Sequence, residues 1–168
     1  MKKIFALALA AAMSLSVLVG CGSKEAEGTN KEVDLNETYA AIEEAMIEKL
    51  GGEENAPMLD TIEGELLDNL YPGLNDLGLK QCVVKAPAIT AVVAEFALAE
   101  AADADQAKQV AEIFQARIDA QAEGGAWYPE TVEGWKNDAT VVTNGNYVML
   151  VAMENNADYI EIFNAQFN

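Results

Sequence analysis

The sequence predicts an α+β fold, in which N-terminal helices precede a ββα-ββα pattern that forms a four-stranded, largely antiparallel sheet with helices packed on it. Two observations predict it. Segments with apolar residues at helical spacing alternate with short runs rich in valine. In addition, Glu-Ile-Phe-Gln-Ala at 112–116 returns as Glu-Ile-Phe-Asn-Ala at 161–165. We therefore hypothesise a duplicated unit with pseudo-twofold symmetry.

Residues 34–50 have the pattern of a first helix. Asp34 and Glu37 form an acidic capping box, and Gly51 follows the helix as a stop signal. One face carries apolar residues at helical spacing, namely Leu35, Tyr39, Ile42, Met46 and Leu50. A second helix is predicted over Thr61–Leu70, with Asp60 as its N-cap and an apolar face made of Ile62, Leu66 and Leu70.

The first ββα unit begins with strands predicted over Gln81–Lys85 and Ala91–Ala99. Asp103, supported by Gln106, is expected to cap the helix that follows. Its apolar face consists of Ala107, Val110, Phe114 and Ile118. Cys82 lies in the first strand, where we expect a small buried hydrophobic residue rather than a reactive thiol.

The second unit begins with a strand over Thr140–Thr143, and Asn144-Gly145 is predicted as a two-residue hairpin turn. The partner strand over Asn146–Met153 has no polar alternation, which predicts a strand covered on both faces. We expect the helices of the two units on one face, and the N-terminal helices or a second copy on part of the other. A last helix from Ala157 directs four residues inward: Tyr159, Ile160, Phe163 and Phe167.

The N-terminus has the pattern of a bacterial lipoprotein leader. Lys2 and Lys3 precede an apolar segment, 4–17, that is too short to span a membrane comfortably. It ends in a lipobox made of Leu18, Val19, Gly20 and Cys21. We therefore predict a signal peptide over 1–20, a lipidated Cys21 with a flexible tether over 21–33, and one globular domain over 34–168. Two acyl chains on Cys21 would hold the protein stably at the outer face of the cytoplasmic membrane.

Composition excludes several classes of function. Of 168 residues, 28 are acidic and 10 basic, and removal of two leader lysines changes the net charge from −18 to −20. Such acidity argues against nucleic acid as a partner. The chain has no histidine, which excludes His-dependent nucleophile systems and metal sites that use histidine. No cofactor is expected, and no metal, because Asp103-x-Asp105 lacks the other ligands of a calcium loop.

The combination of several short motifs resembles the small lipoproteins catalogued as domain of unknown function 4358, which are common in clostridia-like Gram-positive bacteria. The motifs are Leu59-Asp60, Val83-Val84-Lys85 with Pro87, Tyr128-Pro129-Glu130, Gly145-Asn146-Tyr147-Val148 and Ile160-Glu161-Ile162-Phe163. The resemblance implies a membrane-anchored surface domain without an assigned activity. It brings no catalytic residues with it.

The segment 124–135 contains both tryptophans of the chain and is predicted to be a loop. One interpretation is a ligand surface for a peptide or carbohydrate, made of Trp127, Tyr128, Glu130, Glu133 and Trp135. The other, which we favour, is that the tryptophans cap the core. A pair of carboxylates for hydrolysis can be drawn from Glu123, Glu130, Glu133 and Asp138, but 28 acids produce close pairs without catalysis.

Three functions follow from these observations. The first is a non-catalytic binding or accessory module on the cell envelope, with a protein, peptide or carbohydrate as its ligand. The second is a cell-envelope hydrolase that uses paired carboxylates. The third is the solute receptor of a transporter, which we rank last because a mature chain of this length lacks the usual two-lobed cleft.

Overall fold

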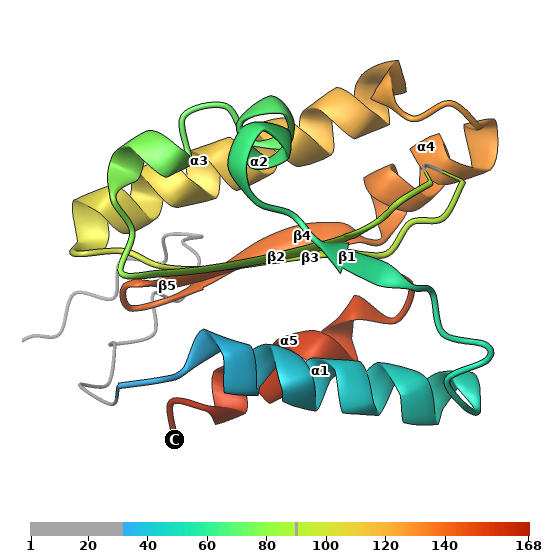
Figure 1. The fold of residues 1–168 in the computed structure, drawn as a ribbon, viewed down its shortest axis with the longest axis horizontal. Coiled ribbons are helices and arrows are strands. Elements are labelled where there is room, and N and C mark those ends of the chain that lie inside the picture. The colour runs from blue at the N-terminus through green and yellow to red at the C-terminus, as the bar shows by residue number, and fades with distance from the viewer. Residues whose placement is uncertain (1–31, 90) are drawn as a thin grey trace, which may run out of the picture.

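The computed structural model describes residues 32–89 and 91–168, and shows a five-stranded antiparallel sheet between two layers of helices (Figure 1). The strands are β1 (Leu59–Thr61), β2 (Gln81–Pro87), β3 (Glu95–Glu100), β4 (Ala139–Asn144) and β5 (Tyr147–Ala152). They lie in the order β1-β2-β3-β5-β4. The predicted α+β class is confirmed, with β1 as one strand more than expected.

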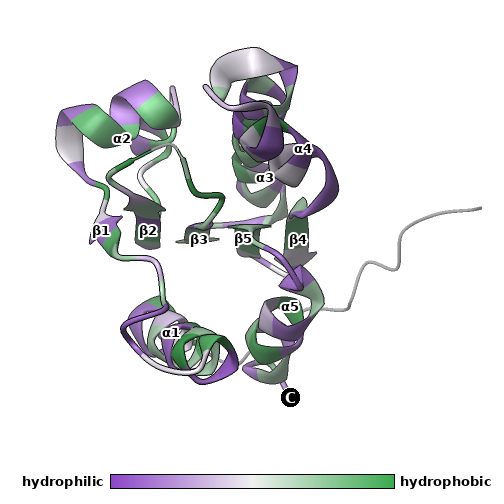
Figure 2. Cartoon of the chain, turned by 90° about the vertical axis from the view of Figure 1, so that its right-hand side faces the viewer, coloured by the Kyte–Doolittle hydropathy of each residue, from purple (hydrophilic) through white to green (hydrophobic). Residues whose placement is uncertain are grey.

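Each face of the sheet has its own helical layer, which Figure 2 shows end-on. One layer contains α2 (Gly64–Leu70), α3 (Ala104–Ala120) and α4 (Pro129–Asn137). The other contains α1 (Leu35–Leu50) and α5 (Asn156–Ala165). All six residues of β3 and all six of β5 are buried, because both strands lie in the middle of the sheet under both layers.

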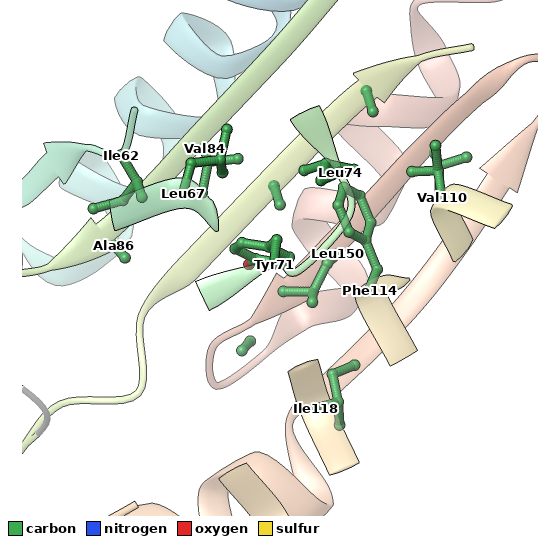
Figure 3. Packing of buried hydrophobic residues seen from close by; sticks show 14 of the residues in the cluster. Ile62, Leu67, Tyr71, Leu74, Val84, Ala86, Val110, Phe114, Ile118 and Leu150 are labelled. Carbon is green, nitrogen blue, oxygen red and sulfur yellow. The ribbon is translucent and has the colours of Figure 1, made fainter. Parts of the chain in front are cut away.

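The first core lies between the sheet and the layer of α2, α3 and α4 (Figure 3). On this face the apolar side chains of β3 are only the small ones of Ala97 and Ala99, which leave room for large residues of the helices. Tyr71 and Phe114 fill that room, with their rings 5.5 Å apart in an edge-to-face arrangement.

The second core lies under α1 and α5 and is rich in aromatic residues. Phe96 of β3 is at its centre, with ring centroids 6.1 Å from Tyr39 of α1 and 5.4 Å from Tyr159 of α5. The predicted apolar face of α1 is buried except at Leu50, which is 36% exposed. In α5, Ile160 is half-buried while the other three predicted residues are buried.

Two of the three predicted helix N-caps, Asp34 and Asp103, are confirmed. Asp34 Oδ1 accepts from the backbone N–H of Asn36 at 2.8 Å and of Glu37 at 3.3 Å. Asp103 Oδ1 accepts from the N–H of Gln106 at 2.9 Å, and Gln106 Oε1 accepts from the N–H of Ala102 at 2.7 Å. These contacts are local in sequence and satisfy N–H groups that a helix cannot pair by itself.

The predicted helix over Thr61–Leu70 is wrong in its first turn and in its buried face. The chain up to Ile62 is extended, because β1 pairs with β2 and the N–H of Ile62 donates to the carbonyl of Val84 at 2.9 Å. Asp60 is therefore a strand residue and not a cap. The helix starts at Gly64 and buries Leu67, while Leu66 is half-exposed.

Two strand boundaries also differ from the prediction. The strand expected from Ala91 begins at Glu95. In the hairpin, Asn144 pairs with Tyr147, so the two turn residues are Gly145 and Asn146 rather than Asn144 and Gly145. Gly145 has a φ of 58° and is followed by a residue with ordinary φ, which is the pattern of a type II′ turn.

The duplicated unit is reproduced in strand order but not in three dimensions. The order β2-β3-β5-β4 is symmetrical about the antiparallel β3–β5 pair. An axis that relates these strands must stand perpendicular to the sheet and would keep both unit helices on one face. In the structure α3 and α5 lie on opposite faces, so no twofold axis relates the two units (Figure 1). The expectation that both helices cover the same face is wrong for this reason.

The leader, the lipobox at Leu18–Cys21 and the tether up to Lys31 lie outside the described residues. Within the described part of the chain, no helix combines the length and apolar character that crossing a membrane requires.

Candidate functional site

The two tryptophans of the predicted aromatic surface have different environments. Trp127 is 85% exposed and Tyr128 is 53% exposed, whereas Trp135 is only 5% exposed and belongs to the first core. The sequence predicts a loop here, but α4 begins at Pro129, which suits the first turn of a helix because it lacks an N–H. The helix turns Trp135 toward the sheet. The core-cap interpretation is therefore confirmed for Trp135 and wrong for Trp127.

The backbone on both sides of Trp127 and Tyr128 is held in place. Ala126, just before Trp127, is buried in the first core. Just after Tyr128, its carbonyl accepts from the Thr131 hydroxyl at 2.8 Å and from the Thr131 N–H at 3.0 Å. The two aromatic side chains thus project from an ordered helix start.

The connection between β2 and β3 lies against α4. A Cβ atom at Gly134 would come within 2.9 Å of Val93 Cγ2, so any larger residue at this position would force the Val93 side chain to shift. The same connection carries Ile89, 65% exposed, and Val92, 41% exposed. Apolar surface from two segments far apart in the sequence therefore gathers around one end of the sheet (Figure 1).

Most of the exposed apolar side chains share this end of the molecule, which we call the distal end. Seven large hydrophobic residues are exposed in the described part of the chain. Leu50 ends α1, and Met58 precedes Leu59, which pairs with Pro87 at the end of β2. The segments that meet at this end of the sheet (Figure 1) carry six of the seven, all but Leu66 of α2: Leu50, Met58, Ile89, Val92, Trp127 and Tyr128.

A buried ion pair between Arg117 and Glu95 lies inside the domain at the distal end. Arg117 near the end of α3 donates through Nε to Glu95 Oε1 at 2.9 Å and through Nη2 to Glu95 Oε2 at 2.8 Å. The side chain of Glu95 is 3% exposed and that of Arg117 is 13% exposed. The Tyr71 hydroxyl also donates to Glu95, and the guanidinium lies 5.4 Å from the Trp135 ring centroid.

This cluster joins α3, β3, α4 and the segment after α2, and every charge in it is paired. Burial, together with the neighbouring Glu95 carboxylate, raises the pKa of Tyr71 well above its ordinary value, so its hydroxyl remains a donor. The cluster has the properties of a structural support. The cluster is not among the features predicted from the sequence, although Arg117 is the only arginine of the chain and Glu95 is a charge inside an apolar run.

A second polar cluster lies at the opposite end of the sheet, where the chain enters the domain. Gln81 accepts from the N–H of Leu35 at 2.9 Å and donates to the carbonyl of Val33 at 2.8 Å. It also donates to Glu100 at 2.7 Å. The N–H of Val33 in turn donates to the Tyr147 hydroxyl at 3.2 Å. The start of the folded domain is thereby fixed to β2, β3 and β5.

The four carboxylates nominated for hydrolysis, Glu123, Glu130, Glu133 and Asp138, lie in or beside α4, and none of them is buried. Glu130 and Glu133 are both exposed on α4, and Glu133 pairs with Lys136 at 2.9 Å. A general acid needs a carboxyl group in apolar surroundings, and the buried carboxylates of the described chain, Glu95 and Glu100, lie elsewhere and accept hydrogen bonds from cations and amides. Nothing in the geometry of α4 favours hydrolysis.

The remaining candidate sites are the thiol of Cys82 and a metal site at Asp103. The side chain of Cys82 reaches solvent rather than being buried as predicted. The protein around it still excludes part of its water, and this desolvation raises the pKa of the thiol to about 11, which keeps it protonated at neutral pH. Among residues 32–89 and 91–168, no group of three His, Cys, Asp or Glu side chains is arranged to hold a metal ion. Asp103 caps α3, as described above.

Comparison with known proteins yields one family. The family model described as Domain of unknown function (DUF4358) matches residues 51–153, from the end of α1 to the end of β5. This stretch includes all five strands, α2 to α4, and five of the six exposed apolar residues at the distal end. No curated protein and no solved structure matches the chain.

Proposed function

The chain belongs to the DUF4358 family, and because that description assigns no activity, we propose its function from its leader and from the surface of the domain. The protein is a lipid-anchored module at the outer face of the cytoplasmic membrane that binds a partner without catalysing a reaction. The lipobox at Leu18–Cys21 supports the anchor. The distal end supports the binding role.

The observation that carries the proposal is the concentration of exposed apolar side chains at the distal end. Monomeric soluble proteins seldom expose such side chains together unless the surface binds something. Trp127 and Tyr128 are residue types that binding surfaces favour, because they offer large contact area with few rotatable bonds. Trp135 and the Glu95–Arg117 pair hold this part of the domain in place. The backbone around Trp127 and Tyr128 is therefore already ordered, so binding loses little conformational entropy.

The position of the distal end relative to the tether also suits a binding surface on a membrane-anchored protein. The chain enters the domain at Val33, beside the first residues of β2 and β5. The distal end lies at the other end of the sheet, separated by the length of α3, which is about 25 Å for its 17 residues. An anchor on Cys21 therefore leaves the distal end free to face away from the lipid.

The charge of the distal end indicates a cationic partner. Glu123 and Glu130 flank Trp127 and Tyr128, and neither forms an ion pair with another described residue. The nearby cations are already neutralised, since Lys136 pairs with Glu133 and Arg117 pairs with Glu95. An exposed indole next to uncompensated carboxylates attracts lysine or arginine side chains through both cation–π and charge interactions. We therefore propose a peptide or protein segment that is basic and partly apolar as the ligand.

Thermal melts of the fragment Gly22–Asn168, which contains every residue of both cores, test the binding role. The probes are synthetic peptides that alternate lysine or arginine with leucine, and matched peptides with glutamate in place of the basic residues. A ligand at a hundred times its Kd stabilises the native state by about 2.7 kcal/mol, which raises the Tm by several degrees. Only the basic peptides should do so.

The matched control uses Leu66, the one large exposed apolar residue of the described chain that lies outside the distal end. The double substitution Trp127→Ala/Tyr128→Ala should abolish the shift, while Leu66→Ala should leave it unchanged. An equal response to basic and acidic peptides, or an unchanged shift in the double variant, would contradict the assignment of this surface.

The anchor requires a separate test. Intact-mass measurement of the protein extracted from membranes should show a diacylglyceryl group on Cys21, and Cys21→Ala should be recovered without lipid. Recovery of an unmodified Cys21 from wild-type membranes would refute lipidation and leave the binding test unaffected.

A further inference from the structure

The two edge strands of the sheet differ in how they are protected against pairing with another chain. Natural sheets shield their edges with short strands, charges or prolines. At one edge, β1 is three residues long and contains Asp60. At the other, β4 is six residues long, Ala-Thr-Val-Val-Thr-Asn, with neither charge nor proline. On a domain with this excess of acid, β4 is an uncharged edge rich in β-branched residues.

The register of the hairpin shows which backbone groups of β4 point outward. In a two-residue hairpin the residues flanking the turn exchange hydrogen bonds, so Asn144, Val142 and Thr140 bond to β5. The bond from the N–H of Met153 to the carbonyl of Asp138 at 3.1 Å continues this alternation. The N–H and C=O groups of the intervening residues therefore point away from the sheet, and these residues are Ala139, Val141 and Thr143.

The side chains of β4 are only partly covered on either face. Ala139 and Val141 pack against the first core, and Val142 packs against the second, but all three remain half-buried. Figure 2 shows β4 at the margin of the sheet, with α5 below it and with no further described strand beyond it. Another strand placed along β4 would extend both cores outward and finish the burial of these residues.

We propose that β4 is an interface between two copies of this chain, which pair edge to edge in antiparallel orientation. The outward-pointing residues are self-complementary about a twofold axis at Val141, because Val141 then faces Val141 of the other copy and Ala139 faces Thr143. This register forms about six hydrogen bonds between the chains. The contact is isologous and closes after two copies, because it uses the only edge of this kind among the described strands.

The absence of charged residues on β4 favours this edge for pairing, and the net charge of each chain makes the pairing depend on salt concentration. Two mature chains that each carry a net charge of −20 repel one another, and an uncharged strand lets them meet without placing carboxylates directly opposite. Their overall repulsion is screened when the Debye length falls from about 10 Å at 0.1 M salt to about 3 Å at 1 M. Association should accordingly strengthen with salt.

Sedimentation of the fragment Gly22–Asn168 over a range of concentration and salt tests the pairing. The molar mass should rise from one chain toward two, and further in high salt. Thr143→Pro removes an outward N–H that β5 does not use, so symmetry removes two interchain bonds and the dissociation constant should rise about tenfold or more. Thr143→Lys should weaken pairing similarly, although it reduces the net negative charge.

Ala116→Lys on the exposed side of α3 is the matched control, since it makes the same change in charge away from β4 and should not weaken association. Thermal melts establish that each variant is folded. A fragment that stays monomeric at all concentrations and salt levels would overturn the proposal, as would a dimer that both Thr143 variants leave intact.

Amide hydrogen exchange supplies an independent measurement that does not depend on any substitution. The N–H groups of Thr140 and Val142 should be protected at every protein concentration, because they bond to β5. Those of Ala139, Val141 and Thr143 should become protected only at concentrations where the dimer forms. Equal exchange of these three amides in dilute and concentrated samples would contradict edge pairing.

Discussion

Replacement of Arg117 by methionine should cost more stability than any surface substitution in this domain. The change leaves Glu95, whose side chain is 3% exposed, without the two charged hydrogen bonds at 2.9 and 2.8 Å that compensate its burial. Removal of one partner from a buried ion pair typically costs about 3–5 kcal/mol. For a domain stable by about 5–15 kcal/mol, that is a large fraction of the total.

Urea unfolding followed by circular dichroism measures this loss. With a slope of about 2 kcal/mol per molar, the midpoint of Arg117→Met should fall by about 1.5–2.5 M. Lys136→Met is the control, because it breaks the exposed pair with Glu133 and should change the free energy of unfolding by less than about 1 kcal/mol.

The triple substitution Arg117→Met/Glu95→Met/Tyr71→Phe separates an unpaired charge from lost packing. It removes both charges and the hydroxyl that bonds to Glu95, so no polar group of the cluster stays buried without a partner. It should therefore recover most of the stability that Arg117→Met loses. An Arg117→Met variant that unfolds at the wild-type midpoint would refute the account of the cluster as a structural support.

Three further predictions concern the neighbourhood of the same cluster. Trp135→Ala should cost about 3–5 kcal/mol in urea unfolding, while Trp127→Ala should stay within about 0.5 kcal/mol, and similar costs would contradict the assigned burial. Gly134→Ala should destabilise by about 1–3 kcal/mol through overpacking against Val93, and a second substitution, Val93→Ala, should relieve the loss in the same assay. Because folding raises the pKa of Tyr71, its neutral form contributes stability that is complete below about pH 10 and is lost as the pH rises further. The urea midpoint should accordingly fall between pH 9 and 11, and Tyr71→Phe should reduce that fall.

The features that could be predicted from the sequence are those set by neighbouring residues. The caps at Asp34 and Asp103 depend on contacts within three residues, and both are found. By contrast, β1 exists because Leu59–Thr61 pairs with a strand about 25 residues away, which no local pattern in three residues can reveal. The sequence predicts the turn one residue too early, at Asn144-Gly145, because Asn144 can also tolerate a turn conformation.

The candidate site was only partly predictable for a similar reason. Trp127 and Trp135 are the same residue type, eight positions apart, and only the docking of α4 on the sheet decides which of them is buried. The Glu95–Arg117 pair joins residues 22 apart in the sequence across two elements. The opposite placement of α3 and α5 depends on the path of the chain after each hairpin, which the shared Glu-Ile-Phe motif does not encode.

For the lipid-anchored form proposed above, the fixation of Val33 has a mechanical consequence. A pull between the membrane and a partner at the distal end would enter the domain through the hydrogen bonds of Val33 with Gln81 and Tyr147, at the first residues of two strands. The force would then run along the strand axes and load many interstrand bonds in shear at once, rather than opening them one by one. In the proposed anchored form, the strands would therefore lie along the line of tension between the anchor and the ligand.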